Sequence, residues 1–248
     1  MSGTLYLIPN TLGAEPGTQV LTGIIPQQVQ ALSASLAYFI AENAKSTRAY
    51  LKILSTHQPL VQPLQLINIS ELNVNTPASA LPTLLQPLLD GHDAGLISEA
   101  GVPAVADPGA NLVRLAHQHG IRVRPLVGPS SLLLALMASG LNGQSFAFQG
   151  YLPQDAQERQ KRLRELEQRS RQEHQTQLFI ETPYRNGVLL DAICQSCQAN
   201  TLVCVATDLS LSGESIQTRS AAQWKKQIQD GKAPDFHKKP TVFLILAA

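Results

Sequence analysis

The 248-residue chain has only 3 cysteines, 5% aromatic residues and no long hydrophobic run. Three cysteines, at Cys194, Cys197 and Cys204, cannot build a disulfide framework, which agrees with a reducing compartment. No apolar stretch approaches the length needed to cross a bilayer, and the N-terminus MSGTLYLIPN lacks the basic start and apolar run of a secretory signal. These absences predict a cytoplasmic protein that does not contact a membrane.

The chain also lacks a strong charge of either sign. Its net charge is +1, with 15% charged and 44% hydrophobic residues. The mean hydropathy of -0.03 is ordinary for a folded globular protein. A chain with so little net charge has no global field that attracts nucleic acid or anionic lipid, so any basic partner surface must be local.

Three common catalytic motifs are missing. The chain contains no G-x-G-x-x-G after its first strand-like run, no G-x-x-x-x-G-K-[ST] and no G-x-S-x-G. The first absence argues against a common dinucleotide-binding fold, the second against a nucleoside triphosphatase. The third argues against a serine hydrolase, because the nucleophile elbow needs its flanking glycines to turn sharply.

Cys194 and Cys197 form a C-x-x-C spacing. A zinc site would need a second pair of ligands, and a redox dithiol usually opens a helix after a strand. This pair instead closes the helical run GVLLDAICQSC, so buried or idle thiols are the better interpretation, and no metal site is expected.

Short apolar runs alternate with amphipathic stretches along nearly the whole chain. This alternation predicts an α/β fold of two α/β domains with mainly parallel or mixed sheets and a ligand cleft between them. The polar turn LNGQ at 141–144 is the predicted boundary, giving domains 1–141 and 145–248. Strands are expected near 5–8, 37–40, 65–69, 95–97, 121–126, 145–149, 177–180, 202–206, 215–219 and 242–246. Helices are expected near 44–54, 82–89, 111–119, 130–138, 156–171, 186–197 and 221–230.

Two loops rich in glycine and proline are the first site candidates. They are SEAGVPAVADPG at 98–109 and VGPSS at 127–131, and each follows a strand-like run and precedes an apolar helix. In an open parallel sheet, ligands bind beyond the carboxyl ends of the strands, where glycines let the backbone come close. Glu99 is placed to accept ligand hydrogen bonds, whereas Asp107 with Pro108 equally suits a helix N-cap with proline at the first helical position.

Two charged segments allow a structural and a functional interpretation. The run ERQKRLRELEQRSRQE at 158–173 is first of all a solvated helix face with opposite charges at i,i+4 spacing, and RNA contact is the minority interpretation. The segment ETPYR at 181–185 follows a strand of the second domain. Glu181 is expected near the crevice, and an ion pair with Arg185 is equally compatible with the spacing.

Together these segments resemble the tetrapyrrole methylase superfamily, and within it the branch of small-subunit ribosomal RNA ribose 2′-O-methyltransferases. The resemblance spans almost the whole chain. It rests on GTLYLIP at 3–9, ISEAGVPAVADPG at 97–109, GIRVRPLVGPSS at 120–131, ASGL at 138–141, QGYLP at 149–153 and ETPYR at 181–185.

The resemblance implies a homodimeric methyltransferase that binds S-adenosylmethionine between its two domains. Carried over position by position, it implies cofactor contacts from both domains. These are Pro9, Glu99, Ala100, Gly101, Val102, Pro103, Ser130, Ser131, Ile180, Glu181, Ala206 and Thr207.

The segments that differ from the branch fall where the methyl acceptor would be handled. The branch's A-E-D-T-R is replaced by AENAKSTR at 41–48, its His-Glu-His-Asn segment by INISELN at 67–73, and its Arg-Glu-Leu-Thr-Lys by ATDLSL at 206–211. A ribose hydroxyl would need a base, and Glu181 and Glu42 are the predicted candidates. The expected acceptor is a ribose 2′-hydroxyl of ribosomal RNA. The alternatives are a small tetrapyrrole-like acceptor or a non-catalytic regulatory protein that binds S-adenosylmethionine.

Overall fold

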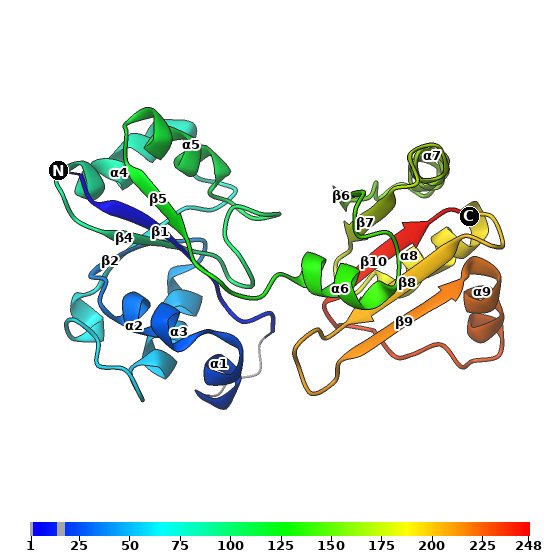
Figure 1. Cartoon of the computed structure of the whole chain (residues 1–248), viewed down its shortest axis with the longest axis horizontal. Coiled ribbons are helices and arrows are strands. Elements are labelled where there is room, and N and C mark those ends of the chain that lie inside the picture. Colours follow the sequence, from blue (N-terminus) through cyan, green and yellow to red (C-terminus); the bar gives the residue numbers. More distant parts are fainter. Residues whose placement is uncertain (1, 14–17) are drawn as a thin grey trace. The chain divides into compact units, whose positions relative to one another are not determined.

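A computed structural model describes residues 2–13 and 18–248 of the chain. Its contacts divide the chain into two compact units, Met1–Ser130 and Ser131–Ala248. Each unit is one sheet of five strands with helices packed on its faces (Figure 1). We refer to them as unit 1 and unit 2.

Unit 1 is built on a parallel sheet with strand order β3-β2-β4-β1-β5. The three central strands are buried because helices cover both faces, as expected for a parallel sheet. Its strands are β1 (Thr4–Ile8), β2 (Tyr38–Ala41), β3 (Asn68–Glu71), β4 (Ala94–Ile97) and β5 (Arg122–Pro125). Its helices are α1 (Thr18–Ile24), α2 (Gln27–Ala34), α3 (Ala44–Leu54), α4 (Leu81–Leu89) and α5 (Ala110–Gln118), with 3-10 turns at Leu64–Leu66 and Ala78–Ala80.

The helices of unit 1 lie on opposite faces of the sheet according to which strand they follow (Figure 1). Helices α1 to α3 pack with Ile8 and Phe39 on one face, and α4 and α5 pack with Leu5 and Ile40 on the other. The chain therefore leaves the neighbouring strands β1 and β4 toward opposite faces. Such a reversal opens a crevice at the carboxyl ends of the two strands, the usual ligand position in an open α/β sheet.

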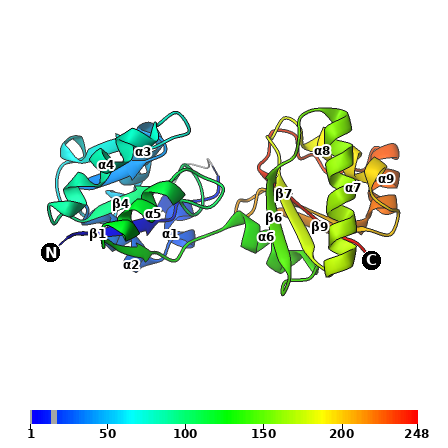
Figure 2. The same cartoon turned by 90° about the horizontal axis from the view of Figure 1, so that it is seen from above.

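Unit 2 is a mixed sheet with order β6-β7-β10-β8-β9, in which only the β6–β7 pair is parallel. Helices α7, α8 and α9 cover one face around the fully buried Trp224, and α6 lies on the other (Figure 2). The strands are β6 (Phe146–Tyr151), β7 (Thr176–Ile180), β8 (Leu202–Thr207), β9 (Ser215–Ser220) and β10 (Thr241–Leu246). The helices are α6 (Ser131–Ser139), α7 (Ala156–Glu173), α8 (Asn186–Ser196) and α9 (Ala221–Gln229).

The predicted strands and helices agree with the structure, with ends that differ by a few residues. The sequence interpretation missed α1 and α2, whose residues are mostly glutamine, threonine, serine and small apolar types without a clear apolar stripe. The predicted boundary at 141–144 also differs from the division after Ser130. Helix α6 precedes that turn but packs on β8, β9 and β10, because its apolar side chains cover the otherwise open face of the second sheet.

No helix among residues 2–13 and 18–248 is both long and apolar enough to span a membrane.

Candidate functional site

Asn10 fastens the loop after β1 to the loop after β4. Its side chain is 8% exposed, and its Nδ2 donates hydrogen bonds to the carbonyl oxygens of Ser98 at 3.2 Å and Glu99 at 3.0 Å. Its backbone N–H donates to the Gly101 carbonyl at 2.8 Å, and the Gly101 N–H donates back to Thr11 at 3.2 Å. Four hydrogen bonds therefore join the two loops.

The loop after β5 reaches the same place through Gly128. A Cβ added at Gly128 would lie 2.1 Å from the Cβ of Pro9, so only glycine allows this approach. Gly101 has φ +66, and a Cβ added there would lie 3.6 Å from the Pro129 carbonyl oxygen. The loops after β1, β4 and β5 thus converge at Pro9, Gly101 and Gly128, and we call this place the three-loop junction.

Glu42 joins β2 to the β1–β4 edge. It follows β2 directly, and its N–H donates to the Ile97 carbonyl at 3.0 Å. Its Oε2 accepts a hydrogen bond from the Glu99 N–H at 3.0 Å, which fixes the start of the loop after β4. The Glu99 side chain itself is exposed.

Asp107 lies in the same loop, half-buried, and it is not the predicted helix cap. Helix α5 begins after Gly109, whose φ is +129, and no side chain caps it, so Pro108 precedes the helix rather than opening it. Burial, and then the negative charge of Glu42, raise the pKa of Asp107 from 3.8 to about 6, against a lowering by a hydrogen bond from Ser98. Glu99 adds a smaller increase in the same direction.

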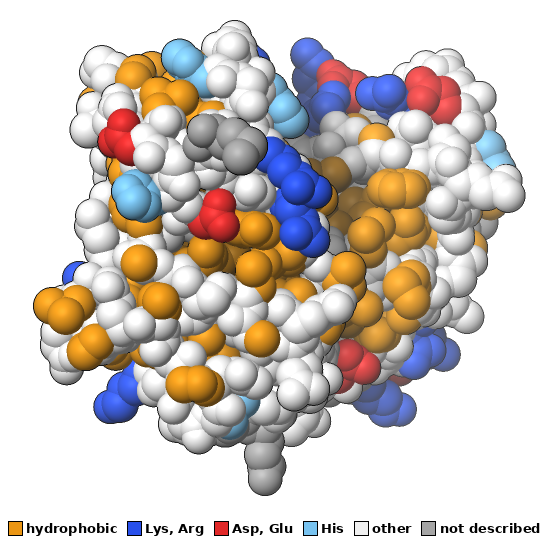
Figure 3. All heavy atoms as spheres, turned by 60° about the vertical axis from the view of Figure 1, so that its left-hand side comes forward, with side chains coloured by type: hydrophobic (Ala, Val, Ile, Leu, Met, Phe, Trp, Pro, Cys, Tyr) orange, Lys and Arg blue, Asp and Glu red, His pale blue; other side chains and the backbone are white. Residues whose placement is uncertain are grey.

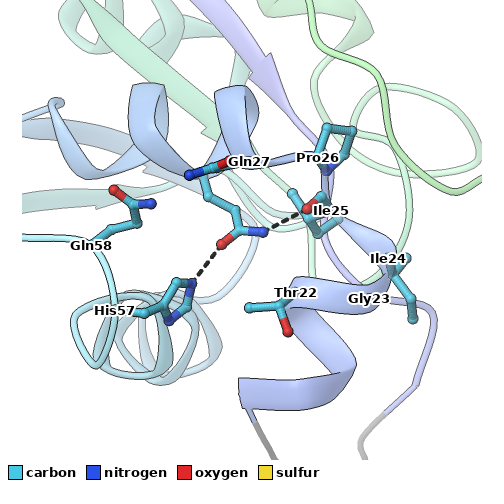
Figure 4. A pocket seen from close by; sticks show the side chains of 9 residues that line it. Thr22, Gly23, Ile24, Ile25, Pro26, Gln27, His57 and Gln58 are labelled. Atoms are coloured by element: carbon cyan, nitrogen blue, oxygen red, sulfur yellow. Dashed lines mark hydrogen bonds between the residues drawn. The ribbon is translucent and has the colours of Figure 1, made fainter.

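Two cavities of unit 1 lie near its loops and helices. One of about 400 Å³ lies between the loop after β3 and the loop after β4, with Asn73, Thr76 and Asp107 in its wall. The other, of about 540 Å³, lies among α1, α2 and the end of α3 (Figure 4). There Gln30 donates to the Ile25 carbonyl at 2.6 Å and faces His57 Nε2 at 2.5 Å, which ties α2 to the end of α3.

In unit 2, the structure brings the ends of β7 and β8 together across β10. Ile180 and Ala206 both pair with Val242, and the Thr207 hydroxyl lies 3.3 Å from the Thr241 hydroxyl. Asn186 Nδ2 donates to the Thr241 hydroxyl at 3.1 Å and to the carbonyls of Phe236 and Lys239. The predicted positions Ile180, Ala206 and Thr207 therefore share one edge of the second sheet.

Glu181 at that edge makes the ion pair that the sequence allowed. Its side chain lies 2.9 Å from the Arg185 guanidinium, and its Oε1 accepts the Thr182 N–H at 2.7 Å. The residue is only 7% exposed, so this pair fastens the turn between β7 and α8. Its predicted role as a base stays a prediction.

The predicted site residues therefore form two groups, one in each unit. Pro9, Glu42, Glu99 to Pro103 and Ser130 belong to unit 1, and Ser131, Ile180, Glu181, Ala206 and Thr207 belong to unit 2. Sequence reasoning missed Asn10, Asn186 and Thr241, because a single amide or hydroxyl carries no spacing signal. The predicted cleft between the domains stays a prediction.

The C-x-x-C pair and the charged helix α7 agree with their structural interpretations. Burial raises the pKa of Cys194 to about 11 and that of Cys197 to about 12, so both thiols are protonated at neutral pH. On α7, Arg162 pairs with Glu165 at 3.3 Å and Arg169 with Glu173 at 3.2 Å, on the exposed surface.

Comparison with known proteins identifies the family. No model of a protein family matches the chain. It is 30% identical over 247 residues to ribosomal RNA small subunit methyltransferase I of Pseudomonas aeruginosa, covering 100% of this chain and 79% of that protein. It is 30% identical to the protein of the same name from Vibrio cholerae, covering 88% and 69%. The chain belongs to the ribosomal RNA small subunit methyltransferase I family.

Solved structures show the same fold at low sequence identity. The methyltransferase CobJ matches with a TM-score of 0.62 and 16% identity over 100% of this chain and 95% of its own. A uroporphyrin-III C-methyl transferase from Thermus thermophilus, complexed with S-adenosyl homocysteine, matches with a TM-score of 0.55 and 14% identity, covering 98% and 97%. The predicted resemblance, fold class and enzyme class, a methyltransferase, are confirmed.

The three-loop junction can be tested with Gly128→Ala. The added methyl overlaps the rigid Pro9 ring, and overpacking of this kind costs about 1–3 kcal/mol. We expect a lower free energy of unfolding in urea and faster amide hydrogen exchange in the loops after β1 and β5. Gly143→Ala is the matched control, since nothing lies within 4 Å of a Cβ there. Equal stability of the two variants would contradict the junction.

Proposed function

We propose that this protein transfers a methyl group from S-adenosylmethionine to a ribose 2′-hydroxyl of small-subunit ribosomal RNA. Membership of the ribosomal RNA small subunit methyltransferase I family supports the acceptor. The observation that supports S-adenosylmethionine as the donor is the three-loop junction, where the loops after β1, β4 and β5 meet at the carboxyl ends of β1 and β4. Crevices at this point of an α/β sheet bind nucleotide-like ligands.

The charges around the junction fit this donor. S-adenosylmethionine carries a positive sulfonium and an ammonium group. Within the described part of the chain, Glu42, Glu99 and Asp107 form no ion pair with a Lys, Arg or His side chain. The negative charges of Glu42 and Glu99 would stabilise a donor cation bound there.

Both groups of predicted residues are proposed to hold the donor. In unit 1 these are Pro9, Ser130 and the loop from Glu99 to Pro103. In unit 2 they are Ser131, Ile180, Glu181, Ala206 and Thr207. When bound, the donor supplies an electrophilic methyl group, and the protein's task is to place the acceptor oxygen about 3 Å from it and in line with the breaking bond.

Two basic residues of unit 1 lie on α3, which follows the carboxyl end of β2. Asn43 caps α3 by accepting hydrogen bonds from the N–H groups of Lys45 and Ser46, which starts the helix at the carboxyl edge of β2. Lys45 and Arg48 are exposed on the first part of this helix. On the face of the molecule that Figure 3 draws, Lys and Arg side chains form separate groups rather than one broad basic field. We propose that Lys45 and Arg48 contact RNA phosphates.

The proposed function is tested by transfer of labelled methyl groups to small ribosomal subunits from cells that lack this modification. We expect one labelled 2′-O-methyl ribose per subunit, and calorimetric binding of S-adenosylmethionine by the protein alone. Binding without transfer to RNA or any tetrapyrrole would favour the regulatory alternative. Transfer only to uroporphyrin-like molecules would favour the small-molecule alternative. If the protein does not bind S-adenosylmethionine, the proposed function and both alternatives are contradicted.

The RNA contact is tested by charge reversal on α3. Lys45→Glu combined with Arg48→Glu should weaken subunit binding and reduce the dependence of log K on log salt by about 1 per lost phosphate contact. Lys52→Glu is the matched control, because Lys52 is exposed in the last turn of the same helix. A salt dependence that stays unchanged in the double variant would contradict the contact.

We also propose that the protein works as a homodimer in the cytoplasm, where ribosomal subunits are made. All three cysteines are free thiols, which suits a reducing compartment. On α6, Leu133 and Met137 are 51% and 79% exposed and lie one turn apart, which presents an apolar stripe.

We expect Met137→Glu to convert a dimer to a monomer in light scattering. Val188→Glu on α8, which also replaces an exposed apolar side chain, should leave the mass unchanged. A monomeric wild-type protein would contradict the proposed dimer.

A further inference from the structure

The cavity of about 400 Å³ in unit 1 lies between two strand-end loops with different chemistry. One wall is the loop after β3, with Asn73, Val74 and Thr76, and the other is the loop after β4, with Asp107 and Pro108. The wall combines apolar groups with amide, hydroxyl and carboxyl groups. A nucleoside fits such a wall, because its base offers a flat apolar surface and its sugar offers hydroxyl groups for hydrogen bonds.

The Asp107 carboxyl group accepts a hydrogen bond from Ser98. It does not cap α5, whose N-cap is Gly109, and it pairs with no basic side chain in the part of the chain that the structure describes. The charged groups that act on it are Glu42 from the end of β2 and Glu99 from its own loop, and both repel its charge. A half-buried carboxylate without a cation destabilises the folded protein unless something else requires it.

The backbone that carries Asp107 is strained. Ala104 and Ala106 have φ values of 66 and 64, in the left-handed region that residues with a Cβ rarely adopt. A conformation of this kind costs about 1–3 kcal/mol at each residue, and it concentrates at functional sites. Asp107 directly follows Ala106, and both residues line the cavity.

Three other carboxylates at the carboxyl edges of the two sheets have structural partners. Glu42 accepts the Glu99 N–H, Glu71 at the end of β3 accepts the Ala44 N–H at 3.0 Å, and Glu181 is paired with Arg185. Asp107 differs from these three because it lies half-buried in the cavity wall, where burial raises its pKa. Asp107 is the carboxylate of this set whose surroundings favour taking up a proton.

We propose that Asp107 is a catalytic residue that takes the proton from the acceptor hydroxyl, and that the cavity between the loops after β3 and β4 receives the nucleoside bearing that hydroxyl. This inference rests on the proposed function. In the step, an oxygen lone pair of the hydroxyl forms the new C–O bond to the methyl group, and the O–H proton passes to a carboxylate oxygen of Asp107. The electron pair of the broken carbon–sulfur bond stays on sulfur, which becomes a neutral thioether.

The first test needs no donor. Because the folded-state pKa of Asp107, about 6, exceeds its ordinary value of 3.8, the folded protein holds a proton between these pH values that the unfolded chain has lost. Stability therefore falls as pH rises from about 4 to above 6. We expect Asp107→Asn to unfold at a higher temperature than the wild type at pH 7.5, with the difference disappearing below pH 4. An Asp107→Asn variant that is less stable at pH 7.5 would assign Asp107 a structural role and overturn the proposal.

The second test measures catalysis. A positioned base contributes about 10²–10⁴-fold, so Asp107→Asn should lower kcat by at least ~100-fold. Its affinity for S-adenosylmethionine in calorimetry should stay within about threefold of the wild type, since loss of a base leaves donor binding intact. The wild-type kcat/KM should rise through pH 6, and this rise should be absent from the variant. Asp90→Asn is the matched control, because Asp90 is an exposed carboxylate at the end of α4, and it should keep wild-type activity.

The outcomes separate the two proposals. If the wild type is active and Asp107→Asn is equally active, only the role of Asp107 is overturned. If Asp107→Asn loses donor affinity in parallel with activity, Asp107 is a donor ligand rather than the base. If the wild type transfers no methyl group to subunits, the proposed function fails, and this role of Asp107 fails with it.

Discussion

The contact between the loops after β1 and β4 is the constraint on which the candidate site depends. Four hydrogen bonds join them, two from the Asn10 amide and two between the backbones of residues 10–11 and 101. A parallel sheet brings its strand ends to one edge but does not fix the loops that follow. Asn10 supplies this connection, and the Gly128–Pro9 contact extends it to the loop after β5. Hydrogen bonds and close packing therefore hold the three strand-end loops against one another.

The electrostatics of unit 1 follow from the same arrangement. The loops after β2 and β4 bring Glu42, Glu99 and Asp107 close enough for the charges of the first two to raise the pKa of the third. The protein tolerates this repulsion, together with two alanines in the left-handed region, in a loop that packs against the core. This arrangement lowers stability, and we propose that it serves a cationic donor near Glu42 and Glu99 and a proton acceptor at Asp107.

The sequence predicted the regular elements well and the individual polar contacts poorly. Alternating apolar runs located the strands, because the central strands of unit 1 are buried on both faces and read as continuous apolar segments. The glycine and proline pattern located the loops of the three-loop junction. Helices α1 and α2 were missed because they have weak apolar periodicity. Helix α6 lies before the predicted boundary although it packs on strands that come later in the chain.

Asp107 shows why local rules fail at such a site. The pair Asp107–Pro108 matches a helix start, but the positive φ of Gly109 delays the helix and frees the carboxyl group. Asn10 is similar, since a single asparagine after a strand predicts only a turn. Both roles depend on contacts with residues that are distant in sequence or on backbone angles, and composition and spacing record neither.

We propose above all that the loops of the three-loop junction bind the methyl donor. The most direct measurement is amide hydrogen exchange of the wild-type protein with and without saturating S-adenosylmethionine. The account predicts that protection rises in residues 9–13, 98–109 and 126–130, with little change in the helix layer around Gln30 and His57. Protection confined to that helix layer, or no change in the three loops at saturation, would contradict it.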